Sequence, residues 1–205
     1  MSRWLANAVS RGEAINDWLS PKRKQSLEQL QQARWPTRKT EAWKYTSVNT
    51  LVEAEYSLLP GSDHREVDPV AGLNSLDILF VDGVLVSGLV DFPQGLSVAS
   101  LADAAEEQRA WAGQIFSQVK PAGHYFGLVN DGLATSGLLI DVAEGVKIDR
   151  PIRIICRQSD GCESHLRILV RVGDRAQVTV IEDFTGDEKS FNTGFSEYVV
   201  GASAM

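Results

Sequence analysis

The sequence has little cysteine and no long uninterrupted apolar run. Two cysteines in 205 residues are too few for a disulfide scaffold, which excludes the small disulfide-rich secreted class. No stretch approaches the roughly 18 consecutive apolar residues that a membrane-spanning helix needs. Polar residues such as Asn7, Arg11 and Glu13 interrupt the apolar positions near the N-terminus, so no secretory leader is indicated. These absences predict a cytoplasmic protein without a membrane partner.

Charge is distributed unevenly along a chain of otherwise ordinary composition. Hydrophobic residues make up 43% and charged residues 23%, which excludes disorder, collagen and coiled coil as descriptions of the whole protein. The first fifty residues hold nine Lys or Arg against four acids, although the whole chain carries −7. Four of the five tryptophans also lie there. Such a shift in composition indicates two structural units.

A basic stretch with aromatic residues can bind nucleic acid, and residues 20–44 are the candidate for such a site. The charge is dilute, however, and acids such as Glu28 and Glu41 interrupt it. A helical unit with a solvated basic face is therefore favoured, and no nucleic-acid partner is expected.

Residues 1–56 are predicted to form that helical unit. Apolar residues recur there at helical spacing, at Trp4, Ala8, Ile15, Leu19, Leu27 and Leu30. Ser20 is expected to cap a second helix, with Pro21 in its first turn. Residues 57–72 are rich in proline and glycine and predict a linker.

Residues 73–122 predict an α/β connector. Asp82-Gly83 separates two β-rich runs, which is typical of a hairpin. Ser100 and Asp103 have the spacing of a capping box, so a helix is expected to begin there. After Gly123 the pattern predicts strands alone.

Within residues 123–205, apolar and charged positions alternate with the period of a strand. In one predicted strand, one face holds Ile152, Ile154 and Cys156 and the other holds Arg153, Ile155 and Arg157. In the next predicted strand, Leu166, Ile168, Val170 and Val172 lie opposite Arg167, Leu169 and Arg171 in the same way. Short strands with near-regular glycine turns are typical of a sandwich, a barrel or a stacked β-helix. The strand predicted at residues 195–200 leaves an open edge, which predicts self-association. We interpret the chain as part of a longer protein.

Several kinds of catalytic site are absent from the sequence. Lys189-Ser190 resembles the end of a phosphate-binding loop, but Asp183 and Glu188 occupy its two glycine positions, where carboxylates would repel phosphate. No serine lies in a nucleophile elbow, and the only histidines are His64, His124 and His165. Glu182-Asp183 is expected to be a turn at a strand end rather than an acid–base pair.

Cys156, Cys162 and His165 are weak candidates for a metal site. They fall within ten residues, but their spacing matches no standard zinc pattern. Strand parity places Cys156 on the apolar face and His165 with the arginines of the other face. A buried Cys156, a turn residue at Cys162 and a surface His165 are therefore favoured. A small metal-binding protein that uses these three residues is the alternative function.

The segment 36–46, PTRKTEAWKYT, is more specific than any of these patterns. It resembles the N-terminal signature of the SufD family of iron–sulfur cluster assembly proteins. In register, the signature positions are Pro36, Thr37, Arg38, Lys39, Glu41, Trp43, Lys44 and Tyr45. Three later segments, 80–86, 95–104 and 164–184, resemble the family in the same order.

The resemblance implies an α+β fold, in which the helical unit and an α/β connector precede the first rungs of a right-handed parallel β-helix. It also implies a non-enzymatic scaffold that pairs with a homologous SufB-type subunit and a SufC-type ATPase. The complex assembles a transient iron–sulfur cluster and passes it on. Family members are longer, so the cluster ligands and the ATPase-binding helices are expected beyond Met205. No cofactor and no catalytic residue are expected in this chain.

The signature also has a physical interpretation. Thr37 can cap a short helix whose first-turn amides bind Thr40 or Glu41. Trp43 and Tyr45 are large amphipathic rings, which are expected to dock the helical unit onto the β-domain. Arg38, Lys39 and Lys44, residues of the same segment, are then expected to form a small basic patch.

Overall fold

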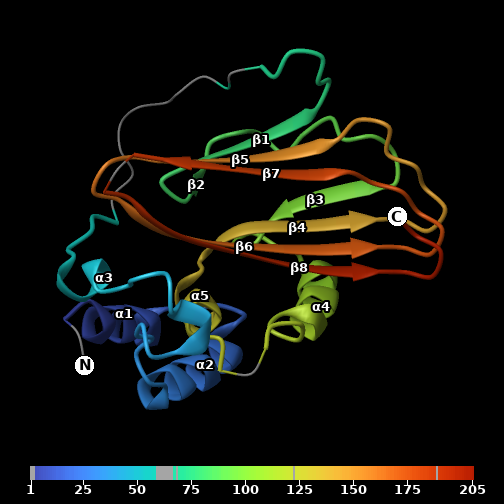
Figure 1. Ribbon diagram of the computed structural model, residues 1–205. Coiled ribbons are helices and arrows are strands. Elements are labelled where there is room, and N and C mark those ends of the chain that lie inside the picture. Colours follow the sequence, from blue (N-terminus) through green and yellow to red (C-terminus); the bar gives the residue numbers. More distant parts are fainter. Residues whose placement is uncertain (1–2, 59–66, 68, 122, 188) are drawn as a thin grey trace.

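The structure is a computed structural model that describes residues 3–58, 67, 69–121, 123–187 and 189–205. It has an α+β architecture (Figure 1). The helices are α1 (Arg3–Ala14), α2 (Ser20–Gln32), the 3₁₀ helix η1 (Glu41–Trp43), α3 (Thr50–Glu53), α4 (Glu106–Ile115) and α5 (Tyr125–Leu133). The strands are β1 (Leu76–Val81), β2 (Val84–Leu85), β3 (Leu96–Ser100), β4 (Ser136–Val142), β5 (Ile152–Gln158), β6 (Glu163–Val172), β7 (Val180–Gly186) and β8 (Phe191–Val200).

The strands form two four-stranded mixed sheets, ordered β2-β1-β5-β7 and β3-β4-β6-β8. From β4 onward the chain alternates between the sheets, and β6, β7 and β8 each pair in parallel with the strand two positions earlier. The short strand β2 pairs antiparallel with β1, and β3 pairs antiparallel with β4. β7 and β8 thus lie at the edges of their sheets. Figure 1 shows the sheets as two layers, with the helices beside the layer that contains β8.

The main hydrophobic core lies between the two sheets. Strand periodicity predicts one face of β5 and β6 correctly, because Ile152, Ile154, Cys156, Leu166, Ile168, Val170 and Val172 are all buried in this core. Leu169 on the opposite face of β6 instead packs against α4 and Phe116. The Asp82-Gly83 hairpin between β1 and β2 is also confirmed. The alternation of apolar residues therefore predicts which side chains face the neighbouring sheet.

A second core joins α1, α2 and α5. Trp4, Leu5 and Ala8 of α1 pack with Leu27 and Leu30 of α2 and with the apolar residues of α5. The predicted stripe on α2 is therefore confirmed. Helix α1 ends at Ala14, so Ile15 and Leu19 lie beyond it rather than in one continuous helix.

Helix α5 overturns the prediction that the chain forms only strands after Gly123. The helix lies between predicted strands, and its glycines and Asn130 have low intrinsic helix propensity. Tertiary packing supplies the stabilisation, because every residue of α5 except Phe126 and the cap is buried. The helix joins the N-terminal helices although some ninety residues separate them in the sequence.

The predicted helix caps are displaced. Ser20 is the first residue of α2 rather than its cap. Its hydroxyl accepts a hydrogen bond from the backbone N–H of Asp17. Ser100 ends β3, and α4 begins later, at Glu106. There the side chain of Gln108 accepts from the backbone N–H of Ala105 at 2.8 Å.

The predicted linker over residues 57–72 includes residues 59–66 and 68, which lie outside the described residues, as does His64. Among the residues that are described, no helix is long and apolar enough to cross a membrane.

Candidate functional site

The signature segment lies on the surface, between α2 and α3. Pro36 is buried, whereas Thr37, Arg38, Lys39, Glu41 and Lys44 are exposed. The hydroxyl of Thr37 accepts from the backbone N–H of Lys39 at 3.2 Å. Thr37 does not cap the short helix, however, because that helix begins at Glu41 and Thr40 is its cap residue. The segment is thus a turn followed by a single 3₁₀ turn.

The two aromatic residues of the signature have different surroundings. Trp43 is half-buried and contacts Phe126 of α5, with 5.1 Å between the ring centroids. Tyr45 is 90% exposed, so the expectation that it docks the helical unit onto the β-domain is wrong. The only ring contact of Tyr45 in the described structure is the ammonium group of Lys44, 5.4 Å from the ring centroid. Of the two signature rings, Trp43 is therefore the one that packs against the rest of the described structure.

A pocket of about 350 Å³ lies beside Trp43. It is lined mostly by apolar and aromatic side chains of the signature region, α5 and the beginning of β8: Trp43, Val48, Leu51, His124, Phe126, Phe191, Asn192, Thr193, Gly194 and Phe195. The imidazole Nδ1 of His124 accepts the backbone N–H of Gly127 at 3.0 Å and caps α5. His124 therefore has a helix-capping role in this wall of the pocket.

The three metal-ligand candidates are not brought together. Cys156 belongs to the core between the sheets, and burial raises the pKa of its thiol to about 12. Cys162 is buried as well, in a bridge to Ser57. Among the described residues, no group of three or more His, Cys, Asp or Glu is arranged to hold a metal ion.

His165 is buried, which corrects the expectation of a surface residue. Its Nε2 lies 2.7 Å from Oε1 of Glu163 and its Nδ1 lies 2.6 Å from the hydroxyl of Thr193. Glu163 also accepts from the indole N–H of Trp4 at 3.1 Å and from the guanidinium of Arg11 at 2.7 Å. Helix α1 is thereby fastened to the beginning of β6 through one carboxylate.

A second polar cluster surrounds Arg167, which is completely buried. The guanidinium donates to the carboxylate of Asp131 at 2.8 Å and to Glu197, and it lies between the rings of Phe116 and Phe195. Strand parity identifies the face of β6 that carries Arg167, but a basic side chain on an outward face is typical of a solvated position. The sequence pattern therefore does not reveal this cluster, because α5 and the α4–α5 connection cover that face only in the folded chain.

The Glu182-Asp183 pair lies inside β7 rather than at its end, so the expected turn is wrong. Glu182 accepts from the hydroxyl of Tyr198 at 2.6 Å. Asp183 accepts from the guanidinium of Arg153 at 2.6 Å. Because the two side chains of neighbouring strand residues point to opposite faces, they do not act as a pair.

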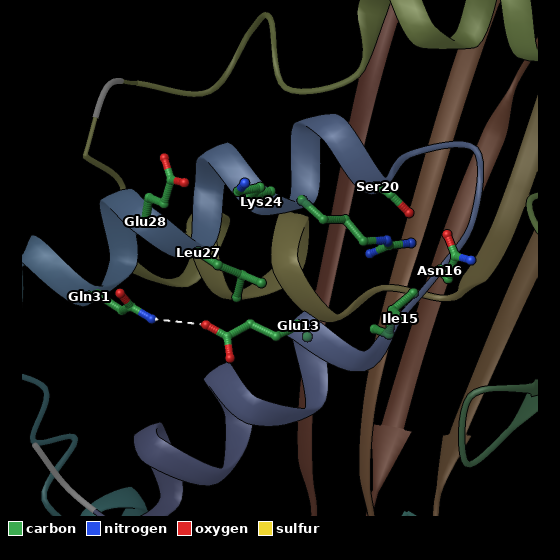
Figure 2. A pocket seen from close by; sticks show the side chains of 10 residues that line it. Glu13, Ile15, Asn16, Ser20, Lys24, Leu27, Glu28 and Gln31 are labelled. Carbon is green, nitrogen blue, oxygen red and sulfur yellow. Dashed lines mark hydrogen bonds between the residues drawn. The ribbon is translucent and has the colours of Figure 1, made fainter.

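A groove of about 610 Å³ lies between α1 and α2 (Figure 2). The side chains of Glu13 and Gln31 are hydrogen-bonded across it at 3.3 Å. A side chain at Gly12 would collide with Leu27, so the glycine allows the two helices to approach closely. Arg23, the buried cation of the groove, already donates to Asp17 and to backbone carbonyls. The groove therefore carries no unused buried cation.

The basic residues between 20 and 44 do not form one surface. Arg23 is buried, and the ammonium group of Lys22 donates to the carbonyl of Phe116 at 3.1 Å. The exposed cations that remain from this stretch are Lys24, Arg34, Arg38, Lys39 and Lys44. Only three of them belong to the signature segment.

Comparison with known proteins agrees with the resemblance seen in the signature. Residues 8–154 match the family model described as the SufBD protein N-terminal region. The chain belongs to the SufBD family. This SufBD chain is 30% identical over 180 residues to iron-sulfur cluster assembly protein SufD of Escherichia coli (strain K12), which covers 84% of this chain and 40% of that protein. It is 24% identical over 186 residues to the chloroplastic protein ABCI7 of Arabidopsis thaliana, covering 82% and 38% respectively. The chain thus spans about two fifths of the length of these relatives.

Proposed function

We propose that this SufBD chain forms the N-terminal part of a scaffold subunit in a SufBCD-type complex that assembles iron–sulfur clusters. The observation that carries the proposal is the family match over residues 8–154, supported by a relative named for iron–sulfur cluster assembly. In the complex, a SufB-type subunit and a SufC-type ATPase are its partners. The cluster is cargo that the whole complex builds and passes on, and the complex works in the cytoplasm.

The strand order supports the proposal that β4 to β8 begin a right-handed parallel β-helix. Each of the last three strands returns to the opposite sheet and extends it in parallel. A stack of this kind grows by adding strands to its last rung. The edges of β7 and β8 are then where further rungs, or another subunit, add to it.

The scaffold has no catalysis of its own in this proposal. The polar clusters around Glu163 and Arg167 are buried and internally hydrogen-bonded, as expected of groups that hold helices against a sheet. ATP hydrolysis is assigned to the SufC-type subunit.

The proposal is tested by capturing the endogenous protein from its source with an antibody raised against this chain. The expected result is recovery of a SufC-type ATPase and a SufB-type subunit, both identified by mass spectrometry. Cells without the protein should also lose activity of a [4Fe–4S] enzyme, while a metal-independent enzyme keeps its activity. Capture without these partners, together with unchanged [4Fe–4S] activity, would contradict the scaffold role.

A further inference from the structure

The exposed face of the signature segment has two features that its packing role does not require. Tyr45 presents nearly its whole ring to solvent, beside the cation of Lys44. Exposed tyrosines next to basic residues are frequent at the centres of protein interfaces, since the ring offers a large contact area at little cost in conformational entropy. One exposed ring does not by itself define a ligand.

The basic residues of the segment indicate the charge of its ligand. Arg38, Lys39 and Lys44 are exposed, and none of them is in an ion pair among the described residues. Some exposed cations elsewhere in the described structure have carboxylate partners, as Arg3 has in Glu55, whereas others, such as Lys24, Arg34 and Arg109, are exposed and have no ion pair within the described part of the chain. Three unpaired cations within seven residues favour an anionic partner.

The pocket beside Trp43 indicates that the ligand also has an apolar part. Trp43 of the signature segment and Val48 and Leu51, which follow it in the chain, line this pocket together with Phe126 and Phe195. A pocket of about 350 Å³ with these walls accepts an apolar or aromatic side chain,. The pocket therefore provides an apolar anchor point next to the basic face.

We infer that Arg38, Lys39, Lys44 and Tyr45, together with the adjacent pocket at Trp43, bind an acidic segment of a partner protein whose apolar side chain fills the pocket. Charge complementarity selects the acidic segment, and the apolar walls select its anchor. Nucleic acid fits less well, because the chain carries −7 overall and two of the cations near this stretch, Lys22 and Arg23, are engaged internally. The inference goes beyond the proposed function, which does not identify what this face contacts.

The test uses the purified 205-residue chain and a fluorescein-labelled glutamate-rich peptide with one central leucine. Fluorescence anisotropy should show binding that weakens as salt is added. The double variant R38E/K39E should bind the peptide at least about tenfold more weakly. Y45S should also bind more weakly without losing stability, because the ring is exposed. A control variant, R109E/K147E, changes the same charge at exposed positions outside the segment and should bind like the unchanged chain.

Three further probes separate the alternatives. The peptide with serine in place of leucine should bind more weakly, and a lysine-rich counterpart should not bind. Equal binding by R38E/K39E and the unchanged chain would overturn the inference, as would tighter binding of a single-stranded oligonucleotide than of the acidic peptide. Because partner recovery in cells is measured separately, loss of this inference would leave the scaffold proposal standing, and the reverse is also true.

Discussion

The carboxylate of Glu163 accepts hydrogen bonds from α1 and so links this helix to the sheet. Burial alone would raise its pKa, but hydrogen bonds and charge from His165 and Arg11 outweigh burial and hold the pKa below its ordinary value of 4.5. For His165, burial lowers the pKa below 6.5, and Glu163 opposes this only in part. Both groups therefore bind protons less readily in the folded protein than in the unfolded chain.

We expect the protein to lose stability on acidification in two stages. The contribution of His165 is complete above pH 6.5, its ordinary pKa, and is lost as the pH falls from there,. The contribution of Glu163 is present above 4.5 and is lost as the pH falls through its lowered folded pKa,. The measurement is the urea midpoint against pH for the unchanged chain and for H165Q. Loss of the first stage in H165Q is expected, and an identical curve would contradict the assignment to His165.

Cys156 should be chemically inert in the folded protein. Its thiol is buried between the sheets, burial raises its pKa to about 12, and the thiolate is the reactive form. Iodoacetamide should therefore label Cys156 far more slowly in buffer than in urea, as followed by peptide mass spectrometry. A C162A variant simplifies the interpretation of the labelling, because it leaves Cys156 as the one thiol. Rapid labelling of the folded chain would show that the core opens at β5.

At the scale of the elements, Arg167 couples β6 to α5 and to β8. It is buried with Asp131 and Glu197, so its replacement leaves Glu197 without a cationic partner among the described residues and leaves Asp131 paired with Lys120 alone. Removing one member of a buried ion pair typically costs about 3–5 kcal/mol of unfolding free energy.

The variant R167M is therefore expected to be severely destabilised in urea unfolding. Arg171, on the same face of β6, is the matched control, since its side chain is 42% exposed and pairs with Asp141. R171M should cost less than about 1 kcal/mol. Similar losses in the two variants would show that the buried ion pairs of Arg167 contribute no more to stability than the exposed pair of Arg171.

The difference between these two arginines also shows which features of the structure the sequence predicts and which it does not. Arg167 and Arg171 have the same strand parity, which was predicted correctly, because the period of two follows from local geometry. What covers each one depends on α5 and α4, which pack against β6 from elsewhere in the chain. The same limit applies to two other residues. His165 is predicted at the surface but is buried, and Tyr45 is predicted to pack but is exposed.

Helix α5 was missed for a related reason. Its glycines and Asn130 weaken the helical pattern, and its burial against α1 and α2 is a long-range property,. The signature segment was located from the residues alone, because its order of side chains is specific. Its division into one anchoring ring, Trp43, and one exposed ring, Tyr45, required the fold.

At the scale of the whole molecule, the arrangement of the sheets makes edge pairing the expected form of self-association. β8 lies at the edge of its sheet, and its last residues Tyr198, Val199 and Val200 are substantially exposed. An exposed apolar edge strand is a template for pairing with another chain. The 205-residue chain should accordingly show a sedimentation coefficient that rises with protein concentration.

Lysine on the edge strand should suppress this association, because pairing would bury its charge. We expect V199K to sediment as a monomer at concentrations where the unchanged chain associates. V90K, at an exposed valine in the loop before β3, adds the same charge away from the edge and should associate normally. If V90K and V199K both become monomeric, net charge rather than the β8 edge controls association. If neither does, the contact lies elsewhere, and the edge of β8 remains accessible to further strands.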